Sequence, residues 1–377
     1  MSGSGFTPQP LPQWRRAVLK VGSSLLAGEG GLDPRHAAVI ARFIMESRAK
    51  QREIVLVSSG AVAAGRSRVA SGGDGLVLRQ ALAALGQASL VSFWQQLLDV
   101  PVAQVLLTHD DLRNRRRYLN ARATLRELLR LGALPVINEN DTVAVDELKL
   151  GDNDNLAAAV ASLVDADVLL IATDIDGLYT AHPQRDPDAR PITQVERVTP
   201  ELLIAAGGAA GALGTGGMRT KLEAAAKAAT AGIATALFCG HDEAVVSALA
   251  KDELRGTLVR AQGDRLRARK QWLRHAPSSG RLQVDEGAVS ALHRRGASLL
   301  PGGVTGVEGD FRRGDVIEVV AATGDAGPIA RGLAQYGADE IRRIARRHSN
   351  DIEAVLGFRY GESVIHRDDL VLLEATE

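Results

Sequence analysis

The sequence contains little cysteine, no excess of charge of either sign and no long apolar run. Cys239 is its single cysteine, which excludes internal disulfides and a cysteine metal cluster. It fits a reducing compartment, where Cys239 is expected to be a small buried apolar residue. Lysine plus arginine and aspartate plus glutamate both number 45, so net charge favours neither a nucleic-acid nor a membrane partner. We find no apolar run of the ~18 residues that a membrane span needs.

The remaining composition is that of an ordinary globular protein, with 45% hydrophobic and 24% charged residues. A length of 377 residues predicts two or three domains. Residues 1–13 are rich in glycine, serine, proline and glutamine and lack an apolar segment. We therefore expect a disordered tail there and no signal peptide.

The centre of the chain has the pattern of a β-α-β unit with polar clusters at its turns. Residues 134–137 form an apolar run that ends in Asn138-Glu139-Asn140-Asp141. A second polar cluster at 151–155 precedes small apolar residues, which is typical of a helix N-terminus. A further apolar run ends at Thr173 and Asp174. Because open α/β sheets bind ligands at the C-terminal ends of their strands, we favour a ligand site over simple turns and caps.

Two lysines accompany turns rich in glycine. Lys20 lies where the predicted strand 17–21 enters a Gly/Ser turn, and Lys221 follows the glycine-rich segment 207–217 at the start of a helix. Free backbone N–H groups and a lysine charge suit a phosphate. Taken singly, an exposed lysine and a mobile loop explain these features as well. The small-residue turn 58–65 is explained equally by ligand approach and by tight strand–helix packing.

Strands and helices alternate as far as residue 259. Predicted strands cover 17–21, 54–57, 103–107, 134–137, 168–172 and 235–239, and predicted helices cover 35–51, 79–98, 120–131, 156–164 and 222–231. This order predicts an α/β domain at 14–259 with an open, mostly parallel sheet flanked by helices.

A second domain is predicted beyond a basic linker at 260–279. Short strands between Gly/Asp turns at 280–377 indicate a small β-barrel-like domain. Basic residues around Trp272 in the linker suit either RNA contact or a solvated surface. The second domain has 12 arginines, no lysine and 16 acidic residues, hence a net charge of −4, whereas a phosphate-backbone binder is normally basic.

The chemistry indicated by the first domain is phosphoryl transfer. Two lysines around a phosphate site would neutralise charge on the transferred group, which is the main task of the protein in such reactions. The sequence offers no evident general base. A carboxylate acceptor has a pKa near ~4.3 and is already ionised at pH 7, so it needs no base, whereas an alcohol usually does.

Six segments, in order and in register, resemble the glutamate 5-kinase family. They are KVGSS at 20–24, VSSGAVAAGR at 57–66, PVINENDTVA at 135–144, GDNDNLAA at 151–158, TDIDGLY at 173–179 and GTGGMRTK at 214–221. The resemblance implies the amino acid kinase fold. The C-terminal segments at 284–304 and 366–370 resemble the PUA domain appended to that family.

The resemblance also implies roles for individual residues. Lys20, Lys221 and Asp154 would be catalytic, with Asp154 orienting the two lysines. The implied glutamate-binding residues are Ser59, Gly60, Asn138, Asp141 and Asn153. The implied nucleotide-binding residues are Lys20, Gly22, Ser23, Thr173, Asp174, Thr215, Gly216, Gly217, Met218, Arg219, Thr220 and Lys221. One departure is His182, where the family usually has aspartate, and it concerns only a loop near the nucleotide.

The implied reaction is ATP plus L-glutamate giving L-glutamyl 5-phosphate, the first step of proline biosynthesis, with Mg²⁺ on the phosphates and no protein ligand named for it. The resemblance further implies inhibition by proline, a cytoplasmic homo-oligomer (dimer or tetramer) and product handover to glutamate-5-semialdehyde dehydrogenase.

Two alternatives remain. One is a related kinase for acetylglutamate, aspartate or carbamate, which GDNDN and the second domain argue against. The other is an RNA-binding protein, which the charge of −4 and the complete kinase site argue against.

Overall fold

A computed structural model describes the chain at residues 5–69, 73, 75–144, 153–181, 183, 186–207, 217–263, 273–274, 276–323 and 327–373. It divides into two compact units. The first comprises Met1–Arg113 and Thr124–Asp264, and the second comprises Asn114–Ala123 and Arg265–Glu377. The predicted domain limits at 14–259 and 280–377 stay predictions.

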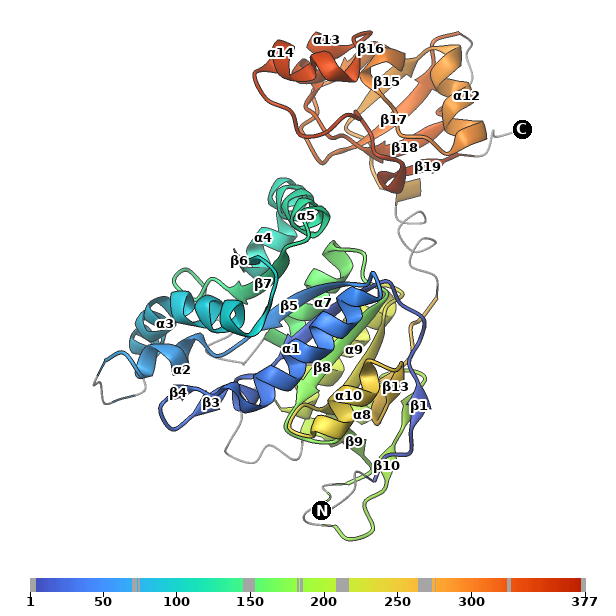
Figure 1. Cartoon of the computed structure of the whole chain (residues 1–377). Coiled ribbons are helices and arrows are strands. Elements are labelled where there is room, and N and C mark those ends of the chain that lie inside the picture. The colour runs from blue at the N-terminus through green and yellow to red at the C-terminus, as the bar shows by residue number, and fades with distance from the viewer. Residues whose placement is uncertain are drawn as a thin grey trace. The chain divides into compact units, whose positions relative to one another are not determined.

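An eight-stranded sheet forms the centre of the first unit (Figure 1). Its strands, in spatial order, are β11 (Gln194–Val195), β14 (Gly256–Val259), β12 (Ala234–Cys239), β8 (Val168–Thr173), β2 (Arg16–Val21), β5 (Glu53–Ser58), β7 (Leu134–Glu139) and β6 (Val102–Leu107). The strands from β12 to β6 are parallel, and β14 is antiparallel to β12. The predicted open, mostly parallel α/β sheet is therefore confirmed.

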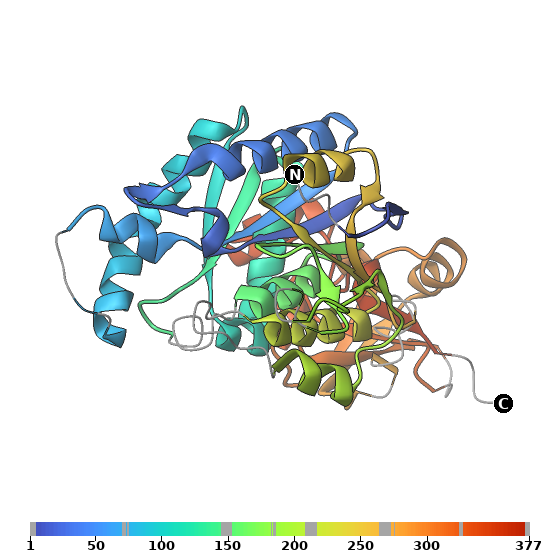
Figure 2. The same ribbon diagram turned by 90° about the horizontal axis from the view of Figure 1, so that it is seen from below.

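Helices cover both faces of this sheet, as Figure 2 shows from below. The helices as far as residue 249 are α1 (Pro34–Ala49), α2 (Ala61–Arg66), α3 (Leu76–Leu97), α4 (His109–Arg113), α5 (Arg115–Arg130), α7 (Asn153–Leu163), α8 (Pro200–Gly207), α9 (Met218–Thr230) and α10 (Glu243–Leu249). The first part of α5 belongs to the second unit. Helices α1, α3 and α10 share one core with Ala17, Leu19 and Val21 of β2. Because side chains alternate along a strand, Lys20 points to the other face, toward α7.

Part of the predicted disordered tail is ordered. Residues Gln9–Pro10 form β1, which pairs antiparallel with β13 (Glu253–Leu254). Phe6 and Leu11 are buried, and Phe6 packs edge-on against Tyr179 with 5.3 Å between the ring centroids. Composition indicated disorder for residues 5–13, but burial of two large apolar side chains holds this segment on the first unit.

The first unit also contains five short elements. These are η1 (Ser23–Leu25), β3 (Ala27–Gly28), β4 (Gly31–Leu32), β9 (Leu178–Tyr179) and β10 (Pro191–Ile192). Strands β3 and β4 pair with each other, and so do β9 and β10. The 3-10 turn η1 directly follows Gly22, so the predicted phosphate turn is the first part of a compact loop after β2.

Helix α3 is long and apolar enough, by length and composition, to cross a membrane, contrary to the expectation that no segment would be. Leu82, Leu90 and Trp94 of this helix are buried, and Leu90 and Trp94 belong to the core that α3 shares with the sheet. Trp94 Nε1 donates a hydrogen bond of 2.9 Å to Ser58 Oγ at the end of β5. These contacts are those of a helix that covers a sheet edge in a globular domain.

The second unit contains a five-stranded mixed sheet. Its strands, in spatial order, are β16 (Val304–Gly309), β15 (Gly280–Val284), β17 (Val316–Ala321), β18 (Ala330–Leu333) and β19 (Leu370–Leu372), and its helices are α12 (Glu286–Arg295), η2 (Pro301–Gly303), α13 (Ala338–Ile344), η3 (Ser349–Asp351), α14 (Ile352–Leu356) and η4 (Arg367–Asp369). Arg122, from the part of α5 that belongs to this unit, forms a buried ion pair of 2.7 Å with Asp369.

Candidate active site

Four neighbouring parallel strands bring most of the predicted site residues to one edge of the sheet. Lys20 lies near the end of β2, and Ser59 directly follows β5. Asn138 is the second-last residue of β7, and Thr173 is the last residue of β8. The strands run in the same direction, so their C-terminal ends lie at the same edge. The sequence prediction of a site at this edge agrees with the positions of these side chains.

Lys20, Asp154 and Lys221 form a buried cluster from three separate elements. Lys20 Nζ is 2.8 Å from Asp154 Oδ1, and Lys221 Nζ is 3.4 Å from Asp154 Oδ2. The Asp154 side chain is 0% exposed, and each lysine side chain is 7% exposed. One carboxylate therefore holds two ammonium groups together where water has little access.

The pKa values in this cluster follow from burial opposed by charge. Burial by itself raises the pKa of the Asp154 carboxyl, but the ammonium groups of Lys20 and Lys221 outweigh it and hold that pKa below its usual range. Burial lowers the pKa of Lys221, and Asp154 and Asp174 oppose this shift. Asp154 is therefore ionised at neutral pH and stabilises positive charge beside the sheet edge.

The N-terminus of α9 contributes a second contact to Asp154. Thr220 Oγ1 donates a hydrogen bond of 2.9 Å to Asp154 Oδ2 and lies 2.9 Å from the Gly217 carbonyl oxygen. Gly217 caps α9 without a side chain, so the free N–H groups of the first turn face outward as in anion-binding helices. Arg219 instead pairs with Glu223 of the same helix at 2.8 Å. Of the predicted nucleotide residues, Thr215 and Gly216 lie outside the described residues, as does His182.

The turn after β2 leaves room for the Lys20 side chain. A Cβ atom added at Gly22 would lie 3.5 Å from Lys20 Nζ, so the ammonium group curls back over this turn. Ser23 begins the 3-10 turn η1 and is exposed. At the end of β8, Thr173 Oγ1 donates a hydrogen bond of 3.1 Å to Asp174 Oδ1. Gly22 and Ser23 thus follow the strand that carries Lys20, and Thr173 and Asp174 lie at the end of the neighbouring strand β8.

A chain of buried polar side chains runs beside the charged cluster. Asn153 Nδ2 donates to Ser59 Oγ at 2.7 Å and to Asn138 Oδ1 at 3.1 Å. Asn138 Nδ2 in turn donates to Gln87 Oε1 of α3 at 3.0 Å. Asn153 and Asp154 are successive residues in the first turn of α7. The start of one helix therefore joins the amide chain to the lysine cluster.

Asp141 is buried shortly after the end of β7, and among the residues that the structure describes no cation is paired with its carboxylate. Burial and the negative charge of Glu139 raise the pKa of Asp141 to about 7, and the positive charge of Arg79 only partly opposes them. Asp141 Oδ1 has no hydrogen-bond partner among the described residues. Gln80 Nε2 of α3 donates to the Asp141 backbone oxygen at 2.9 Å. This bond fixes the backbone at Asp141, and the positive charge of Arg79 offsets the negative charge of Asp141 and Glu139 only in part.

Gly60 has a backbone conformation that favours glycine. Its φ of 108° is in the left-handed region, and an added Cβ would lie 3.3 Å from side-chain carbons of Leu26 and Leu32. Ser59 N donates to the Val21 carbonyl oxygen at 3.0 Å, which ties the turn to β2. The left-handed φ and the contacts with Leu26 and Leu32 account for glycine at position 60, while Ser59 belongs to the amide chain.

Sequence reasoning missed Gln80, Gln87 and Glu139 as residues of this region. Glu139 was seen only as a member of the polar cluster, and the two glutamines lie within an apolar helical pattern. Gln87 interrupts the run ALAALGQASL at 81–90. A single polar residue on the buried side of an apolar helix was the available signal.

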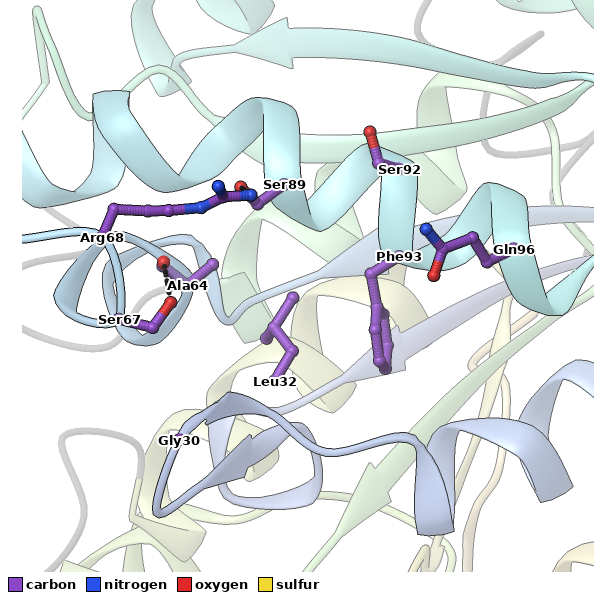
Figure 3. A pocket seen from close by; sticks show the side chains of 9 residues that line it. All are labelled: Gly30, Leu32, Ala64, Ser67, Arg68, Ser89, Ser92, Phe93 and Gln96. Atoms are coloured by element: carbon purple, nitrogen blue, oxygen red, sulfur yellow. Dashed lines mark hydrogen bonds between the residues drawn. The ribbon is translucent and has the colours of Figure 1, made fainter.

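A separate groove lies between α2, α3 and the β3–β4 hairpin (Figure 3). It encloses about 400 Å³ and contains none of the predicted site residues. Its lining residues are Gly30, Leu32, Ala64, Ser67, Arg68, Ser89, Ser92, Phe93 and Gln96. Arg68 Nη2 donates to Ser89 Oγ at 3.0 Å across it.

The described residues do not form a metal cage of their own. Across the described ranges, no group of three or more His, Cys, Asp or Glu side chains is arranged to hold a metal ion. The buried carboxylate of Asp154 is already paired with two lysines. Mg²⁺ usually keeps several waters and binds through substrate phosphate oxygens and few protein ligands.

Two family models and several known proteins match this chain. The model of the amino acid kinase family matches residues 15–239, and that of the PUA domain matches residues 280–356. A glutamate 5-kinase of Xanthomonas oryzae pv. oryzae is 65% identical over 363 residues, covering 94% of this chain and 100% of that protein. A glutamate 5-kinase of Xylella fastidiosa is 60% identical over 377 residues, covering 98% of this chain and 98% of that protein.

Among solved structures, a UMP kinase from Bacillus anthracis aligns with a TM-score of 0.46 and 16% identity, over 67% of this chain and 98% of that one. The family match and the near-complete coverage of both relatives show that the chain belongs to the glutamate 5-kinases of the amino acid kinase family, with a C-terminal PUA domain.

Proposed function

We propose that this chain transfers the γ-phosphoryl group of ATP to the γ-carboxylate of L-glutamate. The products are L-glutamyl 5-phosphate and ADP, which makes the reaction the first step of proline biosynthesis. The observation that carries the proposal is the buried Lys20–Asp154–Lys221 cluster joined to the Ser59–Asn153–Asn138 chain. Both relatives reported above are glutamate 5-kinases.

The lysines would act on the charge of the transferred phosphoryl group. An oxygen of the γ-carboxylate attacks the γ-phosphorus, and the bond from that phosphorus to the β,γ-bridging oxygen breaks, so no proton has to move. Lys20 and Lys221 would lie on either side of this group and neutralise its oxygens, with Asp154 keeping the two ammonium groups in place. Mg²⁺ enters on the phosphates of ATP and supplies further neutralisation.

The amino-acid head would bind in the polar pocket next to this cluster. An ammonium group needs an acidic or carbonyl partner, and Asp141 is the buried carboxylate that lacks a hydrogen-bonded cation in the described structure. Ser59, Asn138 and Asn153 supply the neighbouring polar groups. The α-amino group on Asp141 would leave the γ-carboxylate free to extend toward Lys20.

Proline would inhibit by occupying the same head pocket. It shares the α-carboxylate and the cationic amine of glutamate but has no γ-carboxylate to accept a phosphoryl group. Proline is therefore expected to raise the apparent KM for glutamate and to leave the KM for ATP nearly unchanged. Proline binding that competes with ATP instead of glutamate would contradict this arrangement.

We also propose a cytoplasmic homo-oligomer, a dimer or tetramer, that hands its product to glutamate-5-semialdehyde dehydrogenase. An acyl phosphate hydrolyses readily, which favours direct handover to the next enzyme. The outer side of α3 supports oligomer formation, because Val77 and Leu85 are 78% and 50% exposed there. Light scattering of the purified chain and of Leu85→Glu tests this, with a lower mass expected for the variant.

The reaction itself is tested by trapping the acyl phosphate with hydroxylamine. Purified chain, ATP, Mg²⁺ and L-glutamate should give the glutamyl hydroxamate, and omission of any one should abolish it. Aspartate and N-acetylglutamate serve as alternative acceptors in parallel reactions. Hydroxamate formed from either of these in preference to glutamate would contradict the proposed substrate.

A further inference from the structure

Gln87 connects helix α3 to the amide chain of the proposed amino-acid pocket. Its side chain is 7% exposed, and its Oε1 accepts a hydrogen bond of 3.0 Å from Asn138 Nδ2. The direction of this bond follows from its neighbours. Asn153 Nδ2 donates to Asn138 Oδ1, so the Asn138 amide must turn its NH₂ group toward α3. Gln87 supplies the acceptor that this orientation requires.

The packing of α2 against α3 explains how Gln87 reaches the pocket. A Cβ atom added at Gly86 would lie 1.9 Å from the Ala61 carbonyl oxygen, and one added at Gly65 would lie 1.9 Å from the Leu82 carbonyl oxygen. These two glycines therefore let the helix backbones approach closely. Helix α2 begins directly after Ser59-Gly60, so this contact fixes α3 relative to the same turn that carries Ser59.

A second glutamine on the same side of α3 makes a similar contact. Gln80 lies two helical turns before Gln87, and its Nε2 donates 2.9 Å to the Asp141 backbone oxygen. Residues seven apart lie on nearly the same side of a helix. Helix α3 therefore contacts two residues of the proposed pocket, Asp141 through Gln80 and Asn138 through Gln87.

Packing alone does not account for glutamine at position 87. Its Nε2 is buried and has no hydrogen-bond partner among the described residues. An unpaired buried donor destabilises a fold, so an apolar residue of the same size would serve packing at least as well. The acceptor that Gln87 offers to Asn138 is the feature an apolar residue lacks.

We propose that Gln87 is a positioning residue for the amino-acid substrate, which acts by holding the Asn138 amide in the orientation that binds it. This inference rests on the proposed function, because it assigns Gln87 to the glutamate side of that site. Without the acceptor on α3, the Asn138 amide can rotate by half a turn. Its NH₂ group then takes the place in the pocket that Asn138 Oδ1 now occupies. Binding of glutamate weakens, while the lysine cluster keeps its geometry.

The test is steady-state kinetics of Gln87→Met and Gln87→Leu, which remove the acceptor and retain most of the volume. We expect the KM for glutamate to rise by about tenfold or more, with kcat and the KM for ATP changed by less than about twofold. Thermal stability should stay close to that of the wild type, because one buried unpaired donor, Gln87 Nε2, is exchanged for another, Asn138 Nδ2. Leu90→Met on the same side of α3 is the control for core packing and should leave the KM unchanged.

A double-mutant cycle with Asn138→Ala separates positioning from general loss of structure. If Gln87 acts through Asn138, adding Gln87→Met to Asn138→Ala should raise the KM no further. An unchanged KM in both single variants at position 87 would overturn the inference, and so would the full single-variant penalty persisting beside Asn138→Ala. Wild-type chain in the same assay tests the proposed function separately. If it makes no glutamyl hydroxamate, the proposed function and this inference fail together.

Discussion

Two buried aspartates of the first unit, Asp154 and Asp141, have opposite electrostatic surroundings. Asp154 has two lysine ammonium groups within 3.4 Å and a threonine hydroxyl at 2.9 Å, and its pKa lies below the usual range. Burial and Glu139 raise the pKa of Asp141 to about 7. The same kind of side chain is thus fully ionised at one end of the site and, at pH 7, about half ionised at the other.

The difference between them indicates what each end of the site lacks. Around Asp154 the protein supplies more positive than negative charge, since two lysines face one carboxylate, and an anionic phosphate would complete it. Around Asp141 the negative charge of Asp141 and Glu139 is only partly offset by Arg79, and a further cation would complete this end of the site. An anion and an ammonium group at the two ends are what a phosphoryl donor and an amino acid provide.

The largest effect is expected from removing a cation at the phosphoryl end. Lys20→Ala and Lys221→Ala should each lower kcat by ~10²-fold or more, because each would neutralise charge that develops on the transferred group. The KM for glutamate should change much less. Lys227→Ala, on the same helix as Lys221 but hydrogen-bonded to the neutral Asn155 at 2.6 Å, is the matched control. A folded Lys20 or Lys221 variant with near-normal kcat would remove the lysine cluster from the mechanism.

The next effect is expected from removing the charge at the amino-acid end. Asp141→Asn keeps the shape of the side chain but loses a charge-assisted bond to the ammonium group. This costs about 1.5–3 kcal/mol, or roughly 10- to 150-fold in affinity. Calorimetry should show glutamate and proline weakened together, whereas Asp99→Asn, far along the chain at an exposed position, should bind both normally. Unaltered proline affinity beside lost glutamate binding would place the inhibitor in another site.

The raised pKa of Asp141 predicts that the KM for glutamate depends on pH and that the KM for ATP does not. Only the ionised carboxylate can pair with an ammonium group, and a group with a pKa of about 7 becomes protonated as pH falls below that value. The KM for glutamate should therefore rise roughly tenfold between pH 8 and pH 6. The KM for ATP should not follow it. In Asp141→Asn this dependence should vanish, and an identical slope in that variant would assign the titration to another group.

The smallest effect is expected from the hydroxyl that supports Asp154. Thr220→Val removes the hydrogen bond from Thr220 Oγ1 to Asp154 Oδ2 but leaves both lysine contacts in place. A loss of one such bond is expected to lower kcat about two- to tenfold. Thr230→Val, which removes a bond from the other end of α9 to the Ala226 carbonyl oxygen, should leave kcat unchanged. Equal effects of the two variants would mean that α9 stability, not the support of Asp154, is being measured.

Local patterns were sufficient to predict the elements that carry the site. Apolar runs ending in polar residues predicted β7 and β8, and the small apolar residues after 151–155 predicted α7. Such patterns are readable from the sequence because the spacing of side chains along a strand or helix involves only residues close together in the chain. The open parallel sheet followed from their alternation. Composition misjudged residues 5–13, because it does not register that β1 pairs with β13, 244 positions further along.

The sequence by itself determined the protein family and predicted Lys20, Asp154 and Lys221 as the reacting groups, since lysines and aspartates on characteristic turns are local features. Only the tertiary structure decided how the two aspartates differ and that α3 belongs to the site. A pKa depends on burial and on charges brought close by folding, such as Lys20 and Lys221 at Asp154. Gln87 lies in an apolar helical run, and its contact with Asn138, 51 residues away, exists because Gly65 and Gly86 let two helices approach closely at one edge of the sheet.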